Sequence, residues 1–430
     1  GARAFGRRAG LIAAALFAFD PVLVAFSHRL WSETLFIFLL LATIERLLAA
    51  VRGRRLAPWI AAGLLLGLAG LTRPMILPFA PWLLPWAALQ AWRQARAGRT
   101  AAGDVPPRAW SSTARGFVAL TVACVMVVVP WTLRNYHESG GFILVDTNGA
   151  FNLLVASQPE AAFVDKDDLW DERFGRVDGR RYETYVLEEP ARAQALATAA
   201  ARDNIRAAPG RFLRKSLWEA THLWTLDSFL LRHLRNGWYG ELPRGTIPLA
   251  TLFAAGFVAA LTLAACLGLA TTPAGPLRGL TLLLLLHSTL LFGLTYSLSR
   301  YAVPLHAVLV LFAGVALSRP RDTRARLRRA VLGRMRAATL LLAFAGLGAA
   351  WVRDLPLLAD MVLDDGASHR FRMRRLPANA PVNVNGNAPA NAAVPANVSA
   401  NADAPVPVPA NANVNVPVNV HANAPVSVPS

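Results

Sequence analysis

The first candidate for chemistry is a cluster of polar residues at the opening of the second apolar run of the chain. It comprises the stretches SHR (27–29) and SET (32–34). A glutamate entering a membrane helix at this point could accept a hydrogen bond from a hydroxyl, hold a metal ion or pair with Arg29. The alternative is a helix start in which Ser32 is the N-cap and Glu33 stabilises the positive end of the helix dipole. Both interpretations remain open at this point.

Three arginines lie beside the ends of other apolar runs: Arg73, Arg134 and Arg300. A single arginine at a membrane interface usually extends its charged head toward water. Three arginines at the ends of different runs, on the side of the membrane where positive charge is not expected, indicate a binding role. A guanidinium group can hold a phosphate or pyrophosphate through two hydrogen bonds. Tyr301, beside Arg300, could contact the same group.

Two ionisable residues lie deeper within apolar runs, where they are costly and often mark a site. Asp20 precedes Pro21, and we expect its carboxylate to satisfy backbone groups at the kink that the proline makes. His287 is followed by Ser288, and we expect it to bond across to a neighbouring helix rather than to bind a ligand.

The elements that must position these residues are predicted to be membrane helices. Hydrophobic residues form 54% of the 430-residue chain and charged residues only 16%, against about 25% in soluble domains. A membrane-spanning helix needs about 20 mostly apolar residues. By this criterion the sequence predicts an all-α polytopic membrane protein of about nine spans. The predicted spans are Leu11–Ser27, Glu33–Val51, Leu56–Leu71, Met75–Trp92, Gly116–Leu133, Ile247–Ala270, Leu280–Leu298, Ala302–Leu317 and Ala337–Val352.

The net charge is +18, and the distribution of the basic residues predicts the orientation of these spans rather than a nucleic-acid partner. The arginines come in short bursts between apolar runs, chiefly at 52–55, 93–99 and 319–336. If the nine spans alternate, all these bursts lie on one side, which should be the cytoplasm. We therefore expect a multi-pass protein of the inner or plasma membrane, with the long segment 134–245 and the C-terminal tail outside the cytoplasm.

The chain is predicted to have five parts: spans in 1–133, an extracytoplasmic segment in 134–245, further spans in 246–352, a juxtamembrane segment in 353–376 and a tail in 377–430. Inside the extracytoplasmic segment, Ala191–Ala207 reads as an amphipathic helix. Phe212–Leu234 follows as a helix that lies in the membrane interface or packs on its neighbours. The tail of Ala, Asn, Pro and Val has no apolar face and is predicted to be disordered.

Several stretches together resemble the GT-C membrane glycosyltransferases, especially the family-39 group of protein mannosyltransferases and aminoarabinose transferases acting on lipid A. These are FGRRAGLIAAALFAFDPVLVAFSHRLWSETLFIFLLLA, GLLLGLAGLTRPMILPFAPWLL, VVVPWTLRNYHESGGFILVDTNGAFNLLVASQPEA, ARDNIRAAPGRFLRKSLWEATHLW and SRYAVPLHAVLVLFAG. The resemblance covers about 5–317, and the order and spacing of the motifs carry it.

The resemblance implies inverting transfer of a sugar from a polyprenyl-phosphate donor to an extracytoplasmic acceptor of unknown identity, with a divalent metal as an open possibility. It implies that Glu33 is the acidic residue of the active-site cavity. The expected substrate- and phosphate-binding residues are His28, Arg29, Arg73, Arg134, Arg300 and Tyr301. In the family a catalytic acidic residue lies in the first extracytoplasmic loop. That loop has no counterpart here, so we expect the chain to be truncated at its N-terminus and to lack its general base.

Two other functions stay open. A transporter or flippase for a lipid-linked glycan would require ionisable residues near the middle of the bilayer and internal repeats. The polar residues gather at one face instead, and no convincing repeat is present. A non-catalytic membrane protein of the cell envelope is the third hypothesis, and the tail is compatible with all three.

Overall fold

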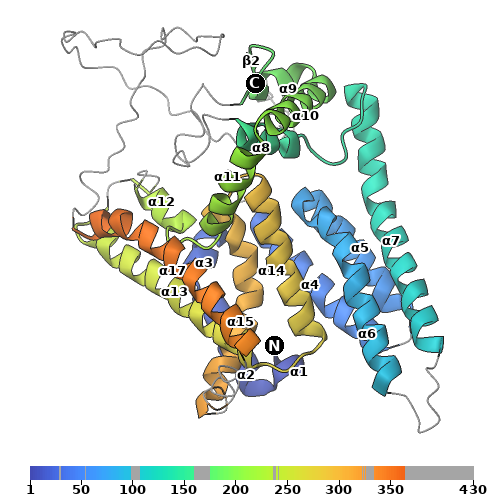
Figure 1. Ribbon diagram of the computed structural model, residues 1–430, viewed down its shortest axis with the longest axis vertical. Coiled ribbons are helices and arrows are strands. Elements are labelled where there is room, and N and C mark those ends of the chain that lie inside the picture. The colour runs from blue at the N-terminus through green and yellow to red at the C-terminus, as the bar shows by residue number, and fades with distance from the viewer. Residues whose placement is uncertain are drawn as a thin grey trace, which may run out of the picture. The chain divides into compact units, whose positions relative to one another are not determined.

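The structure is a computed structural model that describes residues 1–28, 31–53, 55–97, 107–158, 175–235, 239–240, 242–321, 323, 325 and 334–363. Side chains at 97, at 107–109, at 235 and at 334–343 are outside this description. The predicted tail in 377–430 and Arg29 also lie outside the described residues. The described part is almost entirely helical, as the sequence predicted (Figure 1).

Helices form at all nine predicted spans (Figure 1). They are α2 (Arg7–Ala18) with α3 (Pro21–Ser27), α4 (Ser32–Arg52), α5 (Ala57–Thr72), η1 (Pro74–Trp82) with α6 (Leu83–Ala97), α7 (Pro107–Ser139), α13 (Thr246–Thr271), α14 (Pro276–Leu294), η3 (Ser299–Ala302) with α15 (Val303–Ser318), and α17 (Arg334–Leu363). A single turn, α1 (Ala2–Phe5), precedes them.

Within the described residues, five helical segments are long and apolar enough to cross a membrane by themselves: α4, α7, α13, α14, and η3 with α15. The pair α2 and α3 is a sixth candidate, bent by 58°. The apolar helix α5 is shorter, with 16 residues. The protein is therefore a multi-pass membrane protein, and the count of nine spans stays a prediction.

The fourth predicted span is not one α-helix. Its first half, η1, is a 3-10 helix, and α6 begins only at Leu83. Pro78 and Pro81 lie inside η1 and cannot donate the backbone hydrogen bonds of an α-helix. The prolines thus explain why a continuous apolar run gives two elements.

The bend between α2 and α3 is built as the sequence predicted. Asp20 is the N-cap of α3, and its Oδ1 accepts hydrogen bonds from the amides of Val22 at 2.9 Å and Leu23 at 3.2 Å. Its other oxygen, Oδ2, lies 2.8 Å from Nδ1 of His306 in α15. The aspartate therefore caps one half of the broken helix and also ties it to α15.

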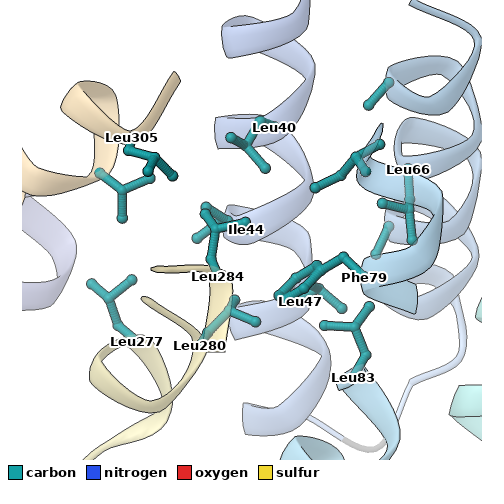
Figure 2. Close-up of a cluster of buried hydrophobic side chains, with 14 of the residues drawn as sticks. Leu40, Ile44, Leu47, Leu66, Phe79, Leu83, Leu277, Leu280, Leu284 and Leu305 are labelled. Carbon is teal, nitrogen blue, oxygen red and sulfur yellow. The ribbon is translucent and has the colours of Figure 1, made fainter. Parts of the chain in front are cut away.

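The largest hydrophobic core lies between α4, α5, η1, α14 and α15 (Figure 2). Leu47, Leu66 and Leu83 are among its fully buried side chains. Glycines allow some of these helices to approach closely. A Cβ added at Gly63 of α5 would overlap a backbone oxygen of α7, and one added at Gly67 would lie 2.7 Å from Cβ of Val127.

The segment 134–245, predicted to be extracytoplasmic, forms a small helical layer where the structure describes it. It contains α8 (Asn148–Ser157), the antiparallel strands β1 (Arg176–Val177) and β2 (Arg180–Arg181), α9 (Tyr182–Glu188) and α10 (Pro190–Ala207). The helix α10 agrees with the predicted amphipathic helix. It buries a stripe of alanines against α8 and α9 together with Tyr182 and Tyr185.

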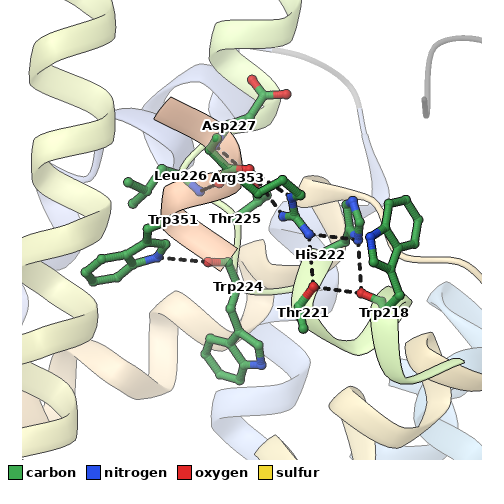
Figure 3. Close-up of polar contacts among 10 residues, drawn as sticks. Trp218, Thr221, His222, Trp224, Thr225, Leu226, Asp227, Trp351 and Arg353 are labelled. Atoms are coloured by element: carbon green, nitrogen blue, oxygen red, sulfur yellow. Dashed lines mark hydrogen bonds and ion pairs between the residues drawn. The ribbon is translucent and has the colours of Figure 1, made fainter. Parts of the chain in front are cut away.

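The prediction of one helix over Phe212–Leu234 is wrong, because this region forms α11 (Pro209–His222) and α12 (Phe229–Arg235). Contacts from α17 hold the connection between them (Figure 3). Asp354 Oδ2 accepts hydrogen bonds from the Thr225 hydroxyl at 2.6 Å and from the Leu226 amide at 2.7 Å. Arg353 donates to the Thr221 hydroxyl at 2.9 Å. The Leu226 amide, which a continuous helix would satisfy through its own backbone, is thus satisfied by a side chain of α17.

Candidate functional site

Glu33 lies in the first turn of α4 and is fully buried. The helix begins with Trp31 in the N-cap position, and no side chain caps it. The interpretation of Ser32 as the N-cap is therefore wrong. The Ser32 hydroxyl instead accepts a hydrogen bond from Nε of Arg73 at 3.2 Å. The start of α4 thus binds an arginine from the end of α5.

Two arginines converge on a single oxygen of Glu33. Nη2 of Arg73 lies 2.6 Å from Glu33 Oε1, and Nη2 of Arg300 lies 2.9 Å from the same atom. Nε of Arg300 also donates to Oε1 at 3.2 Å. The side chains of Arg73 and Arg300 are only 11% and 16% exposed. The chain therefore brings together three of the predicted site residues from α4, the end of α5 and η3.

Aromatic rings surround Arg300. Its guanidinium carbon lies 5.3 Å from the ring centroid of Trp31 and 5.7 Å from that of Phe229, within the range of cation–π attraction. The neighbouring Tyr301 stacks on Phe292, with ring centroids 4.4 Å apart. The rings hold the positive charge of Arg300 in a mostly apolar environment, where electrostatic interactions are stronger than in water.

Two buried polar atoms of this cluster lack a hydrogen-bond partner within the described part of the chain. They are Oε2 of Glu33 and Nη1 of Arg73. A buried donor or acceptor without a partner costs about 1–3 kcal/mol, and more if it belongs to a charged group. The free N–H groups of Arg73 are therefore available to an anion that reaches the cluster.

An apolar pocket adjoins the cluster and shares Tyr301 with it. Its empty volume is about 300 Å³, including its open mouth, and its walls come from α4, η1, α14 and α15. Phe36, Met75 and Pro304 line it. His287 also lines it, and its Nε2 donates to the Met75 carbonyl at 3.1 Å. The expectation that His287 bonds across to a neighbouring element is confirmed.

Two other predicted site residues, Arg134 and His28, do not join this cluster. Arg134 is exposed, lies 5.1 Å from the Trp131 ring and donates to Oδ1 of Asn135 at 3.3 Å. No described contact links it to Glu33. His28 is exposed and follows the last turn of α3. Among the described residues, no three His, Cys, Asp or Glu side chains gather as a metal site.

The sequence analysis missed Asp146, a carboxylate that attracts Arg73. It follows α7 and accepts hydrogen bonds from the amide and the side chain of Asn148, at 3.2 and 2.9 Å. The side chain keeps access to solvent, yet the surrounding protein raises its pKa above the ordinary value, despite the opposing effects of Asn148 and Arg73. No local motif marks this residue, because its meeting with Arg73 depends on how α5 packs on α7.

Comparison with known families supports the resemblance. Residues 1–101 match the family model described as dolichyl-phosphate-mannose-protein mannosyltransferase. Over these residues the match supports a likeness to the GT-C membrane glycosyltransferases. The matched part of the chain contains Glu33 and Arg73, whereas Arg300 lies beyond it. No curated protein and no solved structure matches the chain.

Proposed function

We propose that the protein transfers a sugar from a polyprenyl-phosphate donor to an acceptor outside the cytoplasm, and that Arg73 and Arg300 bind the donor phosphate. The observation that carries this proposal is the convergence of two buried guanidinium groups on one carboxylate oxygen. Both guanidinium groups donate to Glu33 Oε1, and Asp146 attracts Arg73. A phosphate would place a negative charge beside the two guanidinium groups and accept hydrogen bonds from Nη1 of Arg73, which has no partner in the described part of the chain.

The proposed reaction forms a bond between the acceptor oxygen and the anomeric carbon of the sugar. The bond from that carbon to the phosphate oxygen breaks, the polyprenyl phosphate leaves with the bonding electrons, and a base takes the proton of the acceptor hydroxyl. Attack from the side opposite the phosphate would invert the anomeric centre. Arg73 and Arg300 would stabilise the negative charge that grows on the leaving phosphate.

For Glu33 we propose a supporting part in this reaction. Its carboxylate is fully buried, and one of its oxygens already accepts from both arginines. This geometry suits a residue that orients the two guanidinium groups better than one that takes a proton from an acceptor.

The pocket beside Tyr301 suits the start of the donor's lipid chain. Its walls are mostly apolar, as an isoprenoid requires, and they include Met75 and Tyr301, which lie close in sequence to Arg73 and Arg300. In this arrangement the sugar faces the extracytoplasmic segment. Reporter fusions within 190–207 should therefore read out as extracytoplasmic. A cytosolic readout would contradict the proposal that the sugar is transferred outside the cytoplasm.

Substitution of the arginines tests the phosphate site. Arg73→Met and Arg300→Met should each weaken binding of farnesyl phosphate to the protein in lipid nanodiscs by about tenfold or more, since each removes charge-assisted hydrogen bonds. Arg134→Met is the matched control, because Arg134 lies outside the cluster, and it should bind like the wild type. Equal binding by all three variants would refute the proposed site.

A further inference from the structure

We propose that Lys215 and Glu219 of α11 are positioning residues that hold the loop 295–298, and through it place Arg300 against Glu33. The inference rests on the proposed phosphate site, because it concerns the placement of one of its two arginines. It gives the extracytoplasmic segment a direct part in forming the site.

The helix α11 buries charged side chains and exposes apolar ones. Its buried side chains are Lys215, Ser216 and Glu219, with the lysine 2% and the glutamate 1% exposed. Leu213 and Leu217, on the outer face, are 60% and 65% exposed. Burial of a lysine and a glutamate is costly unless both are well hydrogen-bonded. These two residues therefore require partners in the element on which α11 packs, which is α14.

Those partners are backbone groups on either side of Tyr296. The Lys215 ammonium donates to the Thr295 carbonyl, and Oε2 of Glu219 accepts from the Ser297 amide at 2.9 Å. Lys215 thus binds a backbone acceptor one residue before Tyr296, and Glu219 binds a backbone donor one residue after it. Charge-assisted hydrogen bonds of this kind fix the direction of a backbone more strongly than neutral ones.

Close packing brings α11 to this position. Gly293, near the end of α14, leaves so little room that an added Cβ would lie 3.0 Å from the backbone oxygen of Ser216 and 3.3 Å from Cβ of Ala220. The backbone of α11 therefore rests almost on that of α14. This contact fixes the position of α11 along α14, and so determines where the side chains of Lys215 and Glu219 meet the loop.

The loop leads directly into the element that carries Arg300. The helix α14 ends at Leu294, and η3 begins at Ser299, so residues 295–298 lie between two helical elements. Tyr296 is buried and contacts the cluster of Val155 and Leu298. The Tyr301 amide donates to the Leu298 carbonyl at 2.9 Å, which carries the path of the loop directly into η3. A shift of the loop would therefore move Arg300 and Tyr301 together.

The test measures farnesyl phosphate binding by the full chain in lipid nanodiscs. Glu219→Met removes the acceptor of the Ser297 amide, and Lys215→Met removes the donor to Thr295. Each should weaken binding about tenfold, as expected for loss of a charge-assisted hydrogen bond that positions a ligand-binding group. Glu219→Gln keeps an oxygen that can accept from the amide and should restore most of the affinity. Arg211→Met, a charge change on the same helix, is the matched control.

A double-mutant cycle separates positioning from a merely structural effect. If Glu219 acts through Arg300, Glu219→Met should weaken binding no further in a chain that already carries Arg300→Met. An equal loss in both backgrounds would overturn the inference. A loss with Arg300→Met but none with Lys215→Met or Glu219→Met would also overturn it, while leaving the proposed phosphate site intact.

Two further outcomes remain distinct. Normal binding by Arg300→Met would refute the proposed function itself, and with it the role of the loop. If Glu219→Met does not fold, Glu219→Asp replaces it, because the shorter side chain keeps the charge but no longer reaches the Ser297 amide. The same tenfold loss is then expected, and wild-type binding by Glu219→Asp would overturn the inference.

Discussion

Replacement of Glu33 by glutamine should destabilise the protein strongly, because it leaves two cations next to each other without their shared counter-ion. Nη2 of Arg73 and Nη2 of Arg300 lie 2.6 and 2.9 Å from the same oxygen, so these two nitrogen atoms are at most about 5.5 Å apart. At that separation, with an effective dielectric constant of about 20, two unit charges repel each other by about 3 kcal/mol. The carboxylate offsets this repulsion in the wild type.

The expected loss in the free energy of unfolding is about 3–5 kcal/mol, the range found when one partner of a buried ion pair is removed. Unfolding in mixed micelles of increasing SDS content measures it. Glu45→Gln is the control, because its ion pair with Arg3 is exposed, and exposed pairs contribute about 0–1 kcal/mol. The two variants remove the same charge from the same helix, α4.

A second substitution tests the reason for the loss. With Arg300→Met added to Glu33→Gln, only one cation remains in the cluster, and part of the lost stability should return. Phosphate should also stabilise Glu33→Gln more than the wild type, since an added anion replaces the missing carboxylate. The reasoning is refuted if Glu33→Gln unfolds within about 1 kcal/mol of the wild type, or if the double variant is less stable than the single one.

Other positions give independent predictions. Asp20→Ala should cost at least about 1–2 kcal/mol of stability in the same SDS titration, because it removes the N-cap of α3 and also the buried contact with His306. Gly268→Ala should cost about 1–3 kcal/mol, because the new Cβ would overlap the Phe312 carbonyl oxygen, whereas Gly256→Ala, with open space around it, should not reduce stability. Burial raises the pKa of Tyr182 to about 12, so its neutral form is favoured in the folded state. Stability should therefore fall as the pH rises from about 10 toward 12, and Tyr182→Phe should remove that part of the fall along with an absorbance change near 295 nm.

Much of the helical architecture was predictable, because apolar runs of membrane length have few alternatives to a helix. The kink at Asp20 was also predictable, since an acidic residue before Pro21 is a strong local signal for a helix start. The two halves of the fourth span were not distinguished, although Pro78 and Pro81 carry the necessary signal. The break after His222 depends on Asp354, which is distant in sequence, so no local pattern could reveal it.

The site was predictable in part. Glu33, Arg73 and Arg300 were selected because charged residues at the ends of apolar runs are unusual, and the structure brings them together. Arg134 satisfied the same criterion but lies at the surface, since its side chain follows the exposed face of α7. The signal that marked His287 could also have marked His306, an ionisable residue inside an apolar run. Its partner could not be foreseen, because only the packing of α15 on α2 and α3 brings it to Asp20.

The glycines of α5 determine more than how tightly two helices fit. Because the backbones of α5 and α7 touch at Gly63, neither helix can turn about its own axis without a steric clash. The segment after α7 is fastened to that helix by Asn135, whose amide donates to the carbonyls of Ile143 and Val145. The contact between α5 and α7 therefore fixes the position of Asp146 relative to Arg73 at the end of α5. A methyl group added at Gly63, deep in the bundle, would push the two helices apart and displace the Asp146 carboxylate from Arg73.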